Sequence, residues 1–210
     1  MWDNVVPILL GFVLTTVIGG LFASFLQQRS WRYQNAARLR EEERQKASDV
    51  CQRITGVVDK RLYRMQRLLW AITGRAAGHV SAEALRDRLR DYDEVLVEWN
   101  DQLNARLAVV GAYFGADVRD FLDLVLYEAF KDAGRHLEGL YRDVAGPDGE
   151  TRLDETDVAR AGDQLAHLND LAYRLGVTMM VRVREERVGR AAPGALGEAA
   201  LTDGRGASHG

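Results

Sequence analysis

Residues 5–26 read VVPILLGFVLTTVIGGLFASFL, a run of 22 residues without a charged side chain. A helix rises ~1.5 Å per residue, so this run matches the ~30 Å hydrocarbon core of a bilayer. We expect a single transmembrane helix here and a protein anchored in a membrane. A cleaved signal peptide and a buried core helix remain as alternatives. The run exceeds the roughly 7–15 apolar residues of a signal peptide, and it lacks the polar edge that is usual in a core helix.

Charged residues on the two sides of the run predict its orientation. Asp3 is the single charge before it, whereas four arginines follow it closely. These are Arg29, Arg32, Arg38 and Arg40. An excess of arginine marks the cytoplasmic side of a membrane helix, and anionic headgroups attract such a basic segment. We therefore expect a single-pass protein of the inner membrane, with residues 1–4 outside, the rest cytoplasmic, and the four arginines in contact with anionic lipid.

One face of the apolar run carries small residues at every fourth position, namely Thr16, Gly20 and Ser24. Small residues at this spacing let two membrane helices approach closely, so the pattern favours association of the anchor with a second helix. The alternative stays open that glycine is simply more frequent in membrane helices than in soluble ones.

The remaining chain has the size of one domain and the composition of a helical protein. It is rich in Ala, Leu, Arg and Glu, and the whole sequence has only three prolines. The use of 25 arginines against three lysines is typical of a GC-rich bacterial genome. We expect an all-α fold in which the transmembrane helix continues into a cytoplasmic antiparallel bundle of about four long helices.

Apolar residues at spacings of three and four define those helices. The first continues from the apolar run to about Thr73, and residues 74–80 (GRAAGHV) interrupt the pattern. Ser81 is a good amino-terminal cap for the second helix, which ends near Phe114. The third covers residues 116–145, and the fourth begins near Asp154 or Glu155 after the turn at residues 146–149.

These patterns give a domain plan. The apolar face begins at Ala47, and the last 22 residues are small and almost free of large apolar side chains. Such a segment cannot offset the entropy cost of ordering. The plan is a short external segment (1–4), a transmembrane helix (5–26), a basic helical neck (27–46), a helical bundle (47–188) and a disordered tail (189–210).

The net charge of −3 conceals a separation along the chain. Residues 27–75 carry a balance of +7 and residues 76–210 a balance of −9. The basic part is attracted to an anionic membrane surface and the acidic part is repelled from it, which favours a projecting domain. Nucleic acid is not an expected partner, because the larger part of the chain is acidic.

Two rows of charged residues follow the outer faces of the first two helices. Lys60, Arg64 and Arg67 form a basic row. The acidic row, a possible partner surface, consists of Asp87, Asp91, Glu94, Glu98 and Asp101. Both rows are expected to face outward. Two interpretations remain open: simple solvated faces, or complementary surfaces that meet between two protomers, as charges do in coiled coils.

The sequence contains no recognisable catalytic or metal-binding motif. The four histidines, at 79, 136, 167 and 209, are isolated, and the single Cys51 lies on an apolar helix face where a small buried side chain is expected. We predict no cofactor and no enzyme activity.

The leading functional hypothesis is a non-enzymatic membrane-anchored bundle that oligomerises or docks another membrane or cytoplasmic protein. The alternatives are an accessory or signal-transmitting subunit of a membrane complex, and an enzyme with an unrecognised helical site.

Overall fold

The computed structural model describes residues 5–145 and 153–189, without the side chains of residues 5–26, 28–30, 32 and 33. All elements in these ranges are helical, and no strand occurs among them, so the predicted all-α class is confirmed. The chain divides into two compact units, residues 1–43 and 44–210. Three predicted features lie outside the described residues: the external segment 1–4, the turn at 146–149 and the tail from residue 190 onward.

Helix α1 spans Val5–Ala76 without interruption, three residues beyond the predicted end. Across the part of the chain that the structure describes, no helix is both long and apolar enough to cross a membrane. The structure therefore does not support the predicted transmembrane helix. The side chains of residues 5–26, on which that prediction depends, are not among those described, and the same holds for the small residues Thr16, Gly20 and Ser24.

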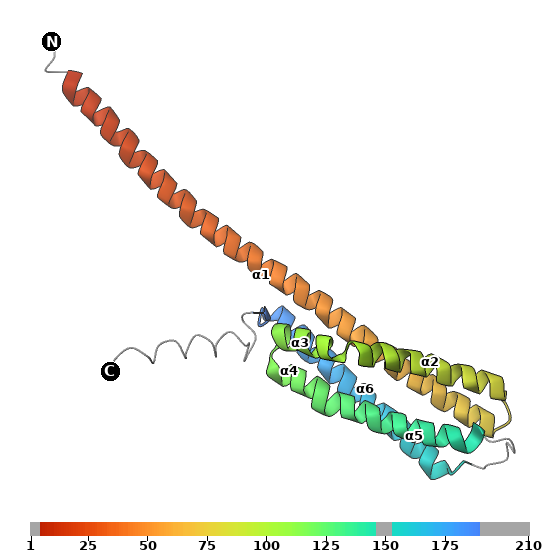
Figure 1. The fold of residues 1–210 in the computed structure, drawn as a ribbon. Helices are drawn as coiled ribbons and strands as arrows, with labels where there is room; N and C mark the ends of the chain where they lie inside the picture. The colour runs from red at the N-terminus through yellow and green to blue at the C-terminus, as the bar shows by residue number, and fades with distance from the viewer. Residues whose placement is uncertain (1–4, 146–152, 190–210) are drawn as a thin grey trace, which may run out of the picture. The chain divides into compact units, whose positions relative to one another are not determined.

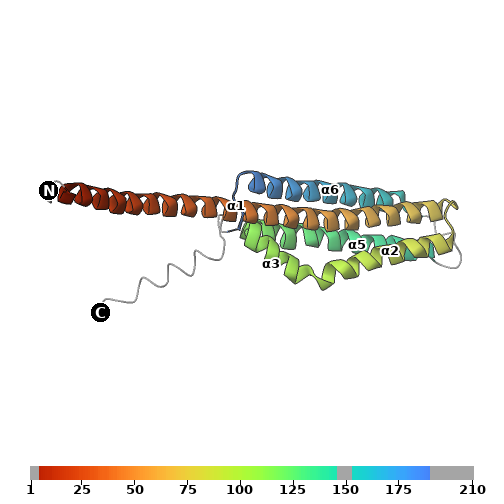
Figure 2. The ribbon, with the colours of Figure 1, turned by 90° about the horizontal axis from the view of Figure 1, so that it is seen from above.

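The second unit consists of four helical rods (Figures 1 and 2). The first is the part of α1 from Arg44 onward. The others are α2 (Ala82–Asp101) with α3 (Leu103–Phe114), then α4 (Ala116–Asp120) with the π-helical turn η1 (Phe121–Leu126) and α5 (Tyr127–Ala145), and finally α6 (Glu155–Arg184). The bundle of four long helices is thus present, but the second rod breaks at Gln102 and the third contains a π-helical turn.

Side-chain contacts fix the order of the rods around the bundle. Lys60 of α1 pairs with Glu98 of α2, and the Trp99 ring of α2 lies 6.0 Å from the Phe130 ring of α5. His136 of α5 lies 2.8 Å from Gln164 of α6, Nδ1 to Oε1. The Thr55 methyl group of α1 would lie 3.5 Å from a Cβ added at Gly176 of α6, so these two rods are also neighbours and the ring is closed. In Figure 2, α6 runs beside α1.

Side-chain caps start two of these helices: the predicted cap at Ser81, and one at Asp154, where only the start of a helix was predicted. The Ser81 hydroxyl accepts a hydrogen bond from the Ala84 amide at 3.1 Å, and the Asp154 carboxylate accepts one from the Thr156 amide at 2.8 Å. Each cap satisfies an amide that has no partner within its helix. The turn between α1 and α2 uses Gly78 at φ +76°, a conformation that residues with a side chain rarely adopt.

The predicted apolar stripes form one core, with a correction in the third rod. In that rod, apolar spacing predicts an inward face that includes Val118, Leu122, Val125 and Phe130. Three of these are buried, but Val125 is 42% exposed and Leu126 is buried in its place. The reason is η1, because a π-helical turn contains more residues than an α-helical one and so shifts the inward face by one position. A search for 3.6-residue periodicity does not detect this shift.

Candidate docking groove

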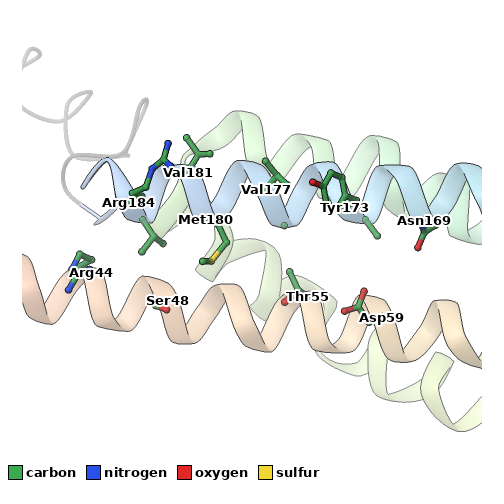
Figure 3. Close-up of a pocket in the computed structure, with 13 residues that line it drawn as sticks. Arg44, Ser48, Thr55, Asp59, Asn169, Tyr173, Val177, Met180, Val181 and Arg184 are labelled. Atoms are coloured by element: carbon green, nitrogen blue, oxygen red, sulfur yellow. The ribbon is translucent and has the colours of Figure 1, made fainter.

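A groove of about 790 Å³ runs between α1 and α6 on the surface of the bundle (Figure 3). The two helices are antiparallel here, since Arg44 of α1 lies near Arg184 of α6 at one end and Asp59 lies near Asn169 at the other. Helices α1 and α6 supply all of the lining of the groove.

One wall of the groove is a row of exposed apolar side chains on α6. Tyr173 is 72% exposed, Val177 42% and Met180 54%. Their spacing of four and three residues places them on one face of the helix, next to the core stripe. Large apolar side chains gathered in one exposed strip are typical of a surface that another molecule covers.

Small side chains form the floor of the groove. Ser48 and Thr55 come from α1, and Ala172 and Gly176 from α6. The Thr55 hydroxyl donates to the Cys51 carbonyl at 2.9 Å, while its methyl group would lie 3.5 Å from a Cβ added at Gly176. Because its hydroxyl is satisfied within α1, Thr55 presents an apolar surface to the groove, and the small residues leave room for an incoming backbone.

The two ends of the groove differ in charge. Arg184, together with Arg44, lies at one end and Asp59 at the other. Neither Arg184 nor Asp59 forms an ion pair with any other residue that the structure describes. Fifteen residues of α1 separate Arg44 from Asp59, which corresponds to roughly 22 Å at 1.5 Å per residue. The groove therefore combines an apolar middle with a cationic end and an anionic end.

Arg61 forms a second unusual feature, in the centre of the bundle. Its side chain is 1% exposed and lies over the Phe130 ring at 4.6 Å and the Trp99 ring at 5.5 Å, measured from Cζ to the ring centroids. The Tyr92 phenol interacts electrostatically with the same guanidinium. Burial lowers the pKa of this guanidinium below its ordinary value, and it raises the pKa of Tyr92.

The partners of Arg61 are aromatic rings and a phenol, with no carboxylate in contact among the described residues. Its Nε and Nη1 atoms, and Nε1 of Trp99, have no hydrogen-bond partner in that part of the chain. Contacts of a desolvated cation with aromatic faces are worth about 2 kcal/mol, which offsets part of the cost of burying the charge. Arg61 thus ties α1 to both α2 and α5.

The predicted charge rows meet within one chain, an arrangement that neither sequence interpretation included. Lys60 Nζ lies 2.6 Å from Glu98 Oε2, and Arg64 Nη1 lies 2.7 Å from Asp91 Oδ2. The hydrogen bond from Lys60 lowers the pKa of Glu98 below its ordinary value. The position of each residue about its own helix axis places both rows away from the apolar stripes. Only the packing of α2 beside α1 brings the two rows together.

The other members of the predicted surfaces are dispersed. Asp87 pairs with Arg90 on its own helix at 2.7 Å, whereas Glu94 and Asp101 are exposed. Of the four predicted lipid-contact residues, Arg38 pairs with Glu42 at 2.9 Å and Arg40 is exposed; the side chains of Arg29 and Arg32 are not described. Lipid contact and a partner at the acidic row stay predictions.

Neither the groove nor the burial of Arg61 was predicted, although the sequence contains a signal for each. Tyr173, Val177 and Met180 widen the apolar face of α6 beyond the stripe that the core needs. Arg61 occupies a position of the core stripe, three residues after Val58 and four before Met65. A charged residue at an inward position indicates a specific buried contact.

Among the described side chains, no three or more of His, Cys, Asp and Glu lie close enough together to hold a metal ion. Comparison with protein-family models, curated proteins and solved structures gave no match.

Proposed function

We propose that this protein is a non-enzymatic scaffold, anchored in the inner membrane by residues 5–26, whose cytoplasmic bundle docks another protein in the α1–α6 groove. The observation that carries the docking function is the exposed apolar row of Tyr173, Val177 and Met180 beside a floor of small residues. Packing this row against a partner would remove apolar surface from water at about 25 cal/mol per Å².

The sequence supports the membrane anchor in this proposal. Residues 5–26 are apolar throughout, and arginine rather than acidic residues follows them. A fractionation experiment tests the anchor. The full-length protein should remain in the pellet after carbonate washing of lysed-cell membranes, and only detergent should release it. Replacing Val13 and Ile18 together by Arg should move it to the supernatant, since two charges at mid-span are costly in lipid. Wild-type protein in the supernatant would refute the anchor.

Site-specific photocrosslinking in cells tests the docking function. A photoreactive residue at Val177 or Met180 should give a discrete adduct of higher mass, whereas the same residue at Leu124 should not. Leu124 is the matched control, because it is 66% exposed and lies on η1, outside the groove. Equal crosslinking from all three positions, or none from the groove, would argue against a docking surface there.

Association of anchors through Thr16, Gly20 and Ser24 is a separate part of the proposal. It is supported by the four-residue spacing of small residues. Gly20→Ile places a large side chain where two helices would cross, so it should reduce the size of the detergent-solubilised protein to that of a monomer. Gly11→Ile, in the same run but outside the spacing, is the control. An unchanged size for Gly20→Ile contradicts this association.

A signal-transmitting subunit is the second candidate function. The break at Gln102 and the turn η1 favour it, because π-helical segments often mark functional sites and are places where a rod can shift its register. Hydrogen exchange of the full chain should then change around residues 99–106 and 121–126 when a membrane partner is added. A response limited to the α1–α6 groove would favour the scaffold.

A further inference from the structure

The shape of the α1–α6 groove selects a helix as its occupant. Its two walls are antiparallel helices, its floor is small at Thr55 and Gly176, and it extends over roughly 22 Å of α1. A single helix of about four turns fits this space, with its apolar side chains between Tyr173, Val177 and Met180. The spacing of those three residues matches an apolar row at i, i+4 and i+7 on the occupant.

The charges at the ends of the groove decide between a second copy and a different protein. The proposed anchor would give two copies the same direction in one membrane, and a parallel, symmetric contact through this groove would place Asp59 against Asp59 and Arg184 against Arg184. Like charges at both ends oppose that pairing. A different helix can carry the opposite charge at each end, which makes a heterologous partner the better match.

We infer that the groove binds one amphipathic helix of a different protein, with an acidic residue at the end next to Arg184 and a basic residue at the end next to Asp59. This inference rests on the proposed docking function and adds the chemistry of the partner. The apolar row supplies the affinity, and the two charges at the ends select the partner and fix its direction in the groove.

Synthetic helices of about four turns are suitable probes. All share one apolar face of Leu and Ala, and they differ only at their ends: one has Glu at one end and Lys at the other, one has Lys at both ends, and one has Glu at both ends. Fluorescence anisotropy measures their binding to the full-length protein in lipid nanodiscs. The mixed Glu/Lys peptide should bind more tightly than either like-charged peptide, by up to about fivefold, since an exposed ion pair is worth at most roughly 1 kcal/mol.

Charge-inverted variants make the test specific. Arg184→Glu gives the groove two acidic ends and should shift the preference to the peptide with two lysines. Asp59→Lys gives two basic ends and should shift it to the peptide with two glutamates. The double variant should prefer the mixed peptide again. These residues are exposed or lie on the groove rim, so the substitutions leave the core unchanged.

Two further variants separate the apolar row from the charges. Met180→Glu should abolish binding of all three peptides, whereas Leu124→Glu, outside the groove, should leave binding unchanged. Each variant is checked for an unchanged helical content by circular dichroism.

Three outcomes would overturn the inference. The first is an absence of binding by every peptide, and the second is binding that does not respond to Arg184→Glu or Asp59→Lys. The third is a disulfide-linked dimer of Val177→Cys in the bilayer, because that places a second copy in the groove. In the first two cases, position-specific crosslinks from Val177 in cells would still support the docking function. Failure of this inference can therefore be distinguished from failure of the proposed function.

Discussion

Gly134→Ala tests how tightly α2 and α5 are packed around Arg61. A Cβ added at Gly134 would lie 2.5 Å from the hydroxyl oxygen of Tyr92, closer than real Cβ atoms approach a neighbour. The Tyr92 side chain is 1% exposed and interacts with the buried Arg61 guanidinium, so it cannot move aside freely. Overpacking of this kind costs about 1–3 kcal/mol, whereas replacing Gly by Ala in a helix gains about 1 kcal/mol.

The expected net effect is a lower free energy of unfolding, by up to about 2 kcal/mol. Gly139→Ala is the matched control, since it lies on the same helix and a Cβ there meets nothing within 4 Å. The control should raise the unfolding free energy by up to about 1 kcal/mol. Each kcal/mol corresponds to about 2–4 °C in Tm for a chain of this size.

Thermal and urea unfolding of the full-length protein in detergent micelles, followed by circular dichroism, measures these differences. Tyr92→Phe provides the decisive background, because the next nearest atom to the new Cβ, the Tyr92 Cζ, lies at an ordinary 3.7 Å. In that background Gly134→Ala should become stabilising. If it stabilises the wild type as Gly139→Ala does, or destabilises both backgrounds equally, the packing argument is wrong.

Three more predictions test other parts of the bundle. Arg182 donates to Asp117 Oδ1 at 3.0 Å and to the Phe114 carbonyl. Arg182→Met should therefore raise the lowered pKa of Asp117 toward its ordinary value, measured by NMR titration, and should weaken the bundle by about 1 kcal/mol. Because the lowered pKa belongs to the folded state, the stability that Asp117 contributes is present above its ordinary pKa of about 3.9 and is lost as pH falls through the folded-state pKa. The difference in unfolding free energy between wild type and variant should therefore narrow in that range, and the part due to the Phe114 carbonyl should remain. Cys51 is 2% exposed and burial raises its pKa, so mass spectrometry should show little alkylation by iodoacetamide until urea unfolds the protein; rapid labelling of the native state would contradict its burial. Ser81→Ala removes the cap of α2 and should cost about 1 kcal/mol in urea unfolding, with Ser48→Ala, which caps no helix, as the control.

Local signals allowed much of the fold to be predicted. Apolar spacing located all four rods, and the cap at Ser81 was predicted from a hydroxyl that can satisfy a free amide. The start of the fourth helix near Asp154 was predicted as well, though not the cap that Asp154 forms. The prediction failed where the backbone leaves regular α-helical geometry. The turn η1 moved Leu126 inward and Val125 outward, and the break at Gln102 divided a helix that the pattern shows as continuous.

The candidate groove was harder to predict than the fold, because it depends on which helices become neighbours. The sequence places Asp59 on a flank of α1 and Tyr173 on a flank of α6, but it does not show that the two flanks border one groove. The same limit applies to Lys60 and Glu98, whose pairing within one chain follows from the position of α2. Helix periodicity gives the angle of each residue about its own axis and no information on the adjacent rod.

By itself, the sequence determined the helical class, the rods and the inward faces of the regular α-helical segments, since these depend on propensity, capping and periodicity within about four residues. Tertiary structure alone decided that Arg61 lies between Trp99 and Phe130, that the charge rows pair within one chain, and that an apolar strip of α6 stays exposed beside α1. These features depend on contacts between residues far apart in the chain, which only packing of the rods around a common core can establish.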